Sequence, residues 1–70
     1  MEHYLIRATI IPKIVEMIEE YYQLSEESAL ASFYRSATGA SLADDATGLY
    51  GQSPLYIFGL YQEEQRERQQ

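Results

Sequence analysis

The sequence predicts an all-α protein, a small array of three main helices and one short helix. Apolar residues between positions 11 and 22 recur at spacings of three and four, which is the helical period. Ser25 precedes two acids, and Ser at a helix start followed by acids in the first turn is a favourable beginning. Ser53 precedes Pro54, and Pro suits the first helical position.

The first helix is expected to end near Tyr22. One face carries the apolar residues Ile11, Ile14, Val15, Ile18, Tyr21 and Tyr22, and the other carries Lys13, Glu16, Glu19 and Glu20. Pro12 interrupts this pattern, because it lacks a backbone N–H. We predict a kinked or broken helix, since Leu5 and Ala8 continue the apolar stripe; a short extended segment over residues 4–10 is the alternative.

The second helix is expected over residues 26–35. Its inner face would carry Ala29, Leu30, Phe33 and Tyr34. The link at residues 23–24 is short, which favours a helical hairpin with the first helix. A short third helix fits residues 36–45, although Gly39 weakens it. Asp44 to Gly48 has the composition of a turn.

The fourth helix is expected from Pro54 to about Arg66. Leu55, Phe58 and Tyr61 would share one face, with Ile57 and Leu60 close to it. The polar residues 62–70 should fray at the end of the chain. The domain prediction is therefore a single helical domain over residues 1–66 with a frayed polar tail at 67–70.

Composition limits the function classes. The chain has 70 residues, no Cys and a net charge of −6. That is one domain at most, of marginal stability, and association is one route to stabilise it. The charge argues against nucleic-acid binding, because phosphates reward clustered Lys and Arg. No apolar run approaches the ~20 residues that span a bilayer, so we expect no membrane segment and a cytoplasmic protein.

No pattern of residues predicts catalysis. Ser36, Ser41 and Ser53 lack a nearby base, because the only histidine is His3. The pair Asp44 and Asp45 offers fewer oxygen ligands than Mg²⁺ or Ca²⁺ requires and is typical of a turn. We therefore expect no enzyme, no metal and no cofactor.

The aromatic residues give the best indication of a functional surface. The chain has seven Tyr and no Trp, and Tyr is enriched at interface hot spots. In the alternative interpretation, about half of these rings simply fill the core. The acids of the first helix would steer a basic partner. The predicted partner-binding residues are Phe33, Tyr34, Tyr50, Tyr56 and Tyr61, with Glu16, Glu19 and Glu20.

One stretch also carries a family resemblance. Ala29, Leu30, Phe33, Tyr34 and Ser36 are followed by the acidic turn at Asp44 and Asp45 and by a Ser53-led helix ending in Glu63 and Glu64. This layout, over about residues 11–64, resembles small uncharacterised bacterial all-helical proteins that accompany toxin-like genes. Some of the toxin-like genes encode proteins with an ADP-ribosyltransferase-like fold. The resemblance implies an antitoxin-like or accessory binding role and no catalytic residue.

The leading hypothesis is a non-catalytic protein-interaction module, either antitoxin-like or an accessory partner of a toxin-type protein. A second hypothesis is a helical protein that associates with itself as a homo-oligomer. A third is a minimal helix-turn-helix regulator, which the helix order allows and the acidic charge opposes.

Overall fold

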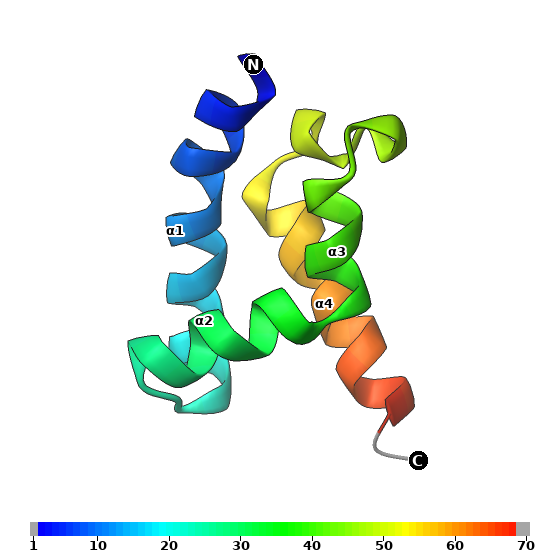
Figure 1. The fold of residues 1–70 in the computed structure, drawn as a ribbon. Helices are drawn as coiled ribbons and strands as arrows, with labels where there is room; N and C mark the ends of the chain where they lie inside the picture. The colour runs from blue at the N-terminus through cyan, green and yellow to red at the C-terminus, as the bar shows by residue number, and fades with distance from the viewer. Residues whose placement is uncertain (1, 69–70) are drawn as a thin grey trace.

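The computed structural model describes residues 2–68 of the chain, with side chains from Leu5 onward (Figure 1). It contains the helices α1 (Glu2–Tyr22), α2 (Glu26–Arg35), α3 (Ala37–Ala43) and α4 (Pro54–Arg68). Two short 3-10 turns, η1 (Asp45–Thr47) and η2 (Leu49–Gly51), join α3 to α4. Residues 2–68 contain no strand, which confirms the all-α prediction.

Helix α1 continues through Pro12, so of the predicted kinked or broken helix the break does not occur, and neither does the extended alternative. Proline removes the hydrogen bond that would end on the carbonyl of Ala8. Ala8 and Pro12 are both exposed, so water can reach that carbonyl. Ile14 and Ile18 are completely buried on the opposite side and hold the helix against the core.

The end of α1 is closed by Gln23, which adopts the left-handed conformation with a φ of 57°. The N–H of Leu24 then donates to the carbonyl oxygen of Glu19 at 3.1 Å, as in a Schellman motif. The chain reverses here, and the Ser25 hydroxyl accepts the N–H of Ser28 to start α2. The predicted bounds of α2 are confirmed.

Ser36 forms the sharp corner between α2 and α3. Its buried hydroxyl donates to the Phe33 carbonyl at 2.6 Å and accepts the Gly39 N–H at 2.9 Å. A Cβ at position 39 would lie 2.0 Å from the Phe33 oxygen. The glycine that weakened the helix prediction is therefore required by close backbone approach.

Helix α4 begins as predicted, because the Ser53 hydroxyl accepts the N–H of Tyr56 at 3.1 Å. It continues to Arg68, two residues past the predicted end. The inner face carries Ile57, Phe58 and Tyr61, whereas Leu55 is 69% exposed. Leu55 is therefore not on the same face as Phe58 and Tyr61, contrary to the prediction, since it lies about a third of a turn away from this buried stripe.

Glu64 joins α4 to the beginning of α3. Its carboxylate accepts the N–H of Ala37 at 2.8 Å and both the N–H and the hydroxyl of Thr38, at 3.0 and 2.9 Å. Burial raises the pKa of Glu64, but these donors and Arg68 outweigh it and hold the pKa below its usual value. The carboxylate also lies where the helix dipole of α3 favours negative charge.

The core lies where α4 packs against both α1 and α3, while α2 crosses between α1 and α3 (Figure 1). Its buried hydrophobic members are Ile14, Val15, Ile18, Ala29, Phe33, Leu42, Leu49, Ile57, Phe58 and Tyr61.

Candidate functional site

The structure separates the predicted aromatic site residues into two groups. Phe33 and Tyr61 are 0% and 1% exposed, so they belong to the core and offer no surface to a partner. The Tyr61 ring packs against Tyr22 and Phe33, and its hydroxyl hydrogen-bonds with the hydroxyl of Ser32. For these two rings, the alternative interpretation as core residues describes the structure.

Tyr34 and Tyr56 form the exposed group, at 58% and 52%. Tyr50 is half-buried and packs against the core. Tyr34 is on α2 and lines a groove, whereas Tyr56 is on α4 and does not line it. The structure therefore does not bring the predicted aromatic residues together on one exposed face.

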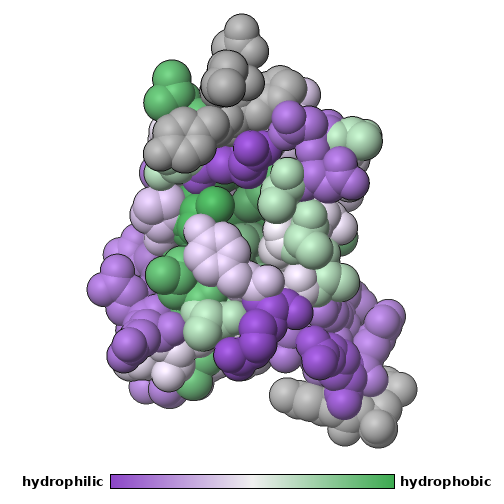
Figure 2. Space-filling model, viewed as in Figure 1, coloured by the Kyte–Doolittle hydropathy of each residue, from purple (hydrophilic) through white to green (hydrophobic). Residues whose placement is uncertain are grey.

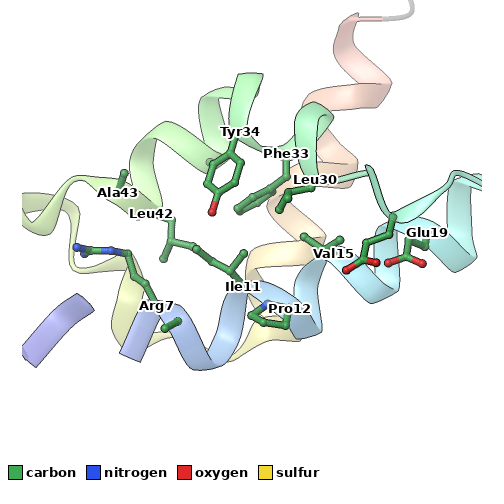
Figure 3. Close-up of a pocket in the computed structure, with 13 residues that line it drawn as sticks. Arg7, Ile11, Pro12, Val15, Glu19, Leu30, Phe33, Tyr34, Leu42 and Ala43 are labelled. Carbon is green, nitrogen blue, oxygen red and sulfur yellow. The ribbon is translucent and has the colours of Figure 1, made fainter. Parts of the chain in front are cut away.

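The groove lies between α1 on one side and α2 with α3 on the other (Figure 3). Its volume is about 530 Å³. Val15, Phe33 and Leu42 are buried beneath it, and Leu30 and Tyr34 are more exposed along α2. Hydrophobic surface is therefore open to solvent here. Figure 2 shows hydrophobic side chains gathered between α1 and α3, with hydrophilic residues above and below them.

The two ends of the groove carry opposite charges. Arg7 lies at one end and Glu19 at the other (Figure 3). The Arg7 guanidinium donates to the Asp45 carboxylate at 2.6 Å and so ties α1 to η1. Glu26 also lines the groove and begins α2 directly after the loop that follows α1, which places it at the Glu19 end.

Five carboxylates lie close together in the chain near the end of α1 and the start of α2, and are called the acidic cluster: Glu16, Glu19, Glu20, Glu26 and Glu27. Of these, Glu19 and Glu26 line the groove. Within the described part of the chain, none of the five forms an ion pair. The last turn of α1 contains no basic residue, although the negative end of a helix dipole favours a cation. The negative charges of Glu19 and Glu20 therefore do not stabilise the isolated chain.

An aromatic seam lies on another side of the molecule, where α1 meets α4. Tyr21 contacts both Tyr22 and Phe58 edge to face, with ring centroids 4.8 and 5.9 Å apart. Burial, together with Tyr61 and Tyr21, raises the pKa of Tyr22 against the opposing effect of Arg66. These rings pack on one another, and the hollow beside them, about 240 Å³, is bordered by polar side chains of α4.

Grouped metal ligands and unpartnered buried polar atoms are absent from residues 5–68. The described side chains include no group of three or more His, Cys, Asp or Glu that could hold a metal ion. Every buried side-chain nitrogen or oxygen in that range has a hydrogen-bond partner. No helix in the described part of the chain is long and apolar enough to cross a membrane.

Sequence reasoning missed the groove but identified some of its residues. Tyr34 and Glu19 line it, as two members of the predicted site. The sequence pattern predicts that Val15 and Leu30 lie on inner helix faces and that Glu26 begins a helix. None of the three therefore indicates a groove. The spacing of Glu26, Leu30 and Phe33 or Tyr34 places them on one side of α2. That side lines a groove only because α2 crosses α1, and the crossing is a tertiary feature that the spacing does not predict.

Comparison with known proteins adds no relative. No family model matches the sequence, and neither a curated protein nor a solved structure matches the chain. The resemblance to companions of toxin-like genes therefore stays a prediction.

Proposed function

We propose that this protein is a non-catalytic interaction module that docks a partner protein in the groove between α1 and α2–α3. The observation that carries the proposal is a hydrophobic groove, open to solvent, that ends at carboxylates with no ion pair in the described chain. Exposed apolar surface next to charge is typical of protein interaction sites.

Tyr34 is the side chain most suited to anchor the partner. It is 58% exposed and contacts the buried Phe33 ring, with centroids 6.1 Å apart. A Tyr that rests on a rigid core loses little side-chain entropy when it is covered, which is one reason for its abundance at hot spots.

The groove suits a protein better than a small molecule. Small-molecule sites place a few convergent polar groups within an apolar cavity. Here the charged groups stand at the two ends, Arg7 at one and Glu19 with Glu26 at the other, and the middle is hydrophobic.

The biological role we propose is that of an antitoxin-like or accessory partner of a toxin-type protein. It is supported by the resemblance described above, and it requires no chemistry from this chain. Neutralisation would be steric, through occupation of the partner's surface. The absence of Cys suits a reducing compartment, so we propose a cytoplasmic location.

The test compares the tagged wild-type chain with Tyr34→Ala and Tyr56→Ala in affinity capture from the native host. Both side chains are exposed Tyr, so the two substitutions are matched in chemistry and differ in place. We expect one stoichiometric partner with the wild type and Tyr56→Ala, and its loss with Tyr34→Ala while the helical circular-dichroism signal is unchanged. Retention by Tyr34→Ala would contradict the groove as the docking site.

Self-association is the second candidate, and the outer face of α4 favours it. Leu55, Tyr56 and Leu60 are 69%, 52% and 36% exposed. Gly59 lies between them, and a Cβ there would meet no atom within 4 Å, so packing within the chain gives no reason for a glycine in mid-helix. A sedimentation mass at a multiple of 8.1 kDa, reduced to the monomer by Tyr56→Ala, would support this candidate.

A further inference from the structure

The shape of the groove limits what can occupy it. Along α1 its lining extends from Arg7 to Glu19, a rise of roughly 18 Å for a helix. That length corresponds to about three turns of a second helix. Both walls are helices, and residues 2–68 include no strand edge, so an extended peptide would find no ladder of main-chain hydrogen bonds here.

The charge of the groove limits the occupant further. Two carboxylates of the acidic cluster, Glu19 and Glu26, line one end, and the described chain neutralises neither of them through an ion pair. A cationic segment arriving there would meet complementary charge. It would also relieve the repulsion between Glu19 and Glu20 and the negative end of the α1 dipole.

We propose that the groove binds an amphipathic α-helix of the partner protein, antiparallel to α1. This inference rests on the proposed function. The helix places aliphatic side chains against the accessible lining residues Ile11, Leu30 and Tyr34. Lys or Arg from its first turn lies beside Glu19 and Glu26.

The orientation follows from the helix dipole. The positive N-terminal end of the bound helix lies at the acidic cluster, and its C-terminal carbonyls lie at the Arg7 end. Because Arg7 already binds Asp45, the acidic end contributes most to the orientation.

A displayed library of 14-residue helical peptides tests this proposal on the full chain. The peptides carry aliphatic residues at spacings of three and four, and Lys, Gln or Glu at random in the first and last turns. We expect enrichment of Lys in the first turn and no such enrichment in the last. A selected peptide, labelled for fluorescence anisotropy, should gain helical signal on binding and lose affinity as salt rises.

Two double variants with equal loss of charge separate the groove from general electrostatics. Glu19→Gln with Glu26→Gln should weaken the selected peptide by roughly fivefold, as expected for two partly exposed ion pairs. Glu63→Gln with Glu67→Gln on α4 should leave its affinity unchanged. Glu26, Glu63 and Glu67 are exposed and Glu19 is half-buried, so these variants should fold.

Three results would overturn the proposal. The wild-type chain could enrich no peptide beyond those that the Tyr34→Ala variant enriches. Both double variants could weaken peptide binding equally, or the selected peptide could bind without a gain of helical signal. If Tyr34→Ala abolishes capture of the native partner while the peptides fail, the groove remains the docking site and the helical occupant is wrong. If Tyr34→Ala keeps the native partner as well, the proposed function fails with it.

Discussion

Carboxylates have opposite surroundings in two regions of the molecule. One region is the contact between α3 and α4, and the other is the groove between α1 and α2–α3. Between α3 and α4, Glu64 lies at the N-terminus of α3 and accepts three hydrogen bonds from Ala37 and Thr38. At the groove, Glu19 lies in the last turn of α1 and forms no ion pair in the described chain. One carboxylate therefore stabilises the fold, whereas the other remains available to a partner.

This difference separates a carboxylate that stabilises the fold from carboxylates that we propose to bind a partner. A helix N-terminus favours an anion and a C-terminus disfavours it. The side chain in the favourable position is largely buried, with 16% of its surface exposed, and its pKa is lowered. Local rules are violated in natural proteins mainly at functional sites, which is the reason for assigning the acidic end of the groove to binding.

The largest expected change in stability distinguishes a buried tyrosine, Tyr61, from an exposed tyrosine at the groove, Tyr34. Tyr61→Ala removes a buried ring and should destabilise the protein by about 3–5 kcal/mol, enough to unfold a domain of this size in part. Tyr34→Ala removes an exposed ring and should change stability by less than about 1 kcal/mol. Urea unfolding followed by circular dichroism measures both, and equal loss of stability would show that Tyr34 is a core residue.

A pair of glycines gives the next effect. Gly39→Ala would push a Cβ against the Phe33 carbonyl and should cost about 3 kcal/mol, at the upper end for overpacking. Gly59→Ala meets open space and should stabilise the monomer by about 1 kcal/mol, since Ala suits a helix interior better than Gly. The same unfolding experiment checks both, and a neutral Gly39→Ala would mean that the α2–α3 corner can open.

The third prediction concerns Glu64, whose effect on stability is smaller than that of Tyr61 or Gly39 and depends on pH. Glu64→Gln should cost about 2 kcal/mol near neutral pH, because it weakens hydrogen bonds to a charged group. The folded-state pKa lies below the usual 4.5, so the stabilisation is complete above that pH and is lost as pH falls through the folded pKa. Wild type should therefore lose more stability than Glu64→Gln on acidification below pH 4.5, whereas parallel losses would assign the effect to other acids.

Much of the fold could be predicted from local signals. Ser25 and Ser53 mark the starts of α2 and α4, because a cap acts on the turn that follows it. The course of α1 could not be predicted in this way. Whether Pro12 breaks a helix depends on the packing of its other face and on solvent at the freed carbonyl, and both are tertiary properties.

The candidate site was less accessible to sequence reasoning. A Tyr on an amphipathic helix has the same local pattern whether another helix covers it or not. Tyr61 is covered by Tyr22 and Phe33, and Tyr34 is left open. The contacts between α4 and α3 through Glu64 link residues 26 and 27 positions apart, and no local signal identifies such a pair.

The corner at Ser36 also has a consequence for the order of folding. A helix of seven residues does not form by itself, because nucleation outweighs the few bonds gained. The first amides of α3 bind a side chain from α4, and the Ser36 hydroxyl joins α3 to the last turn of α2. We therefore expect α3 to form together with the docking of α4, so that during synthesis the middle of this chain would become helical only after Glu64 has been added.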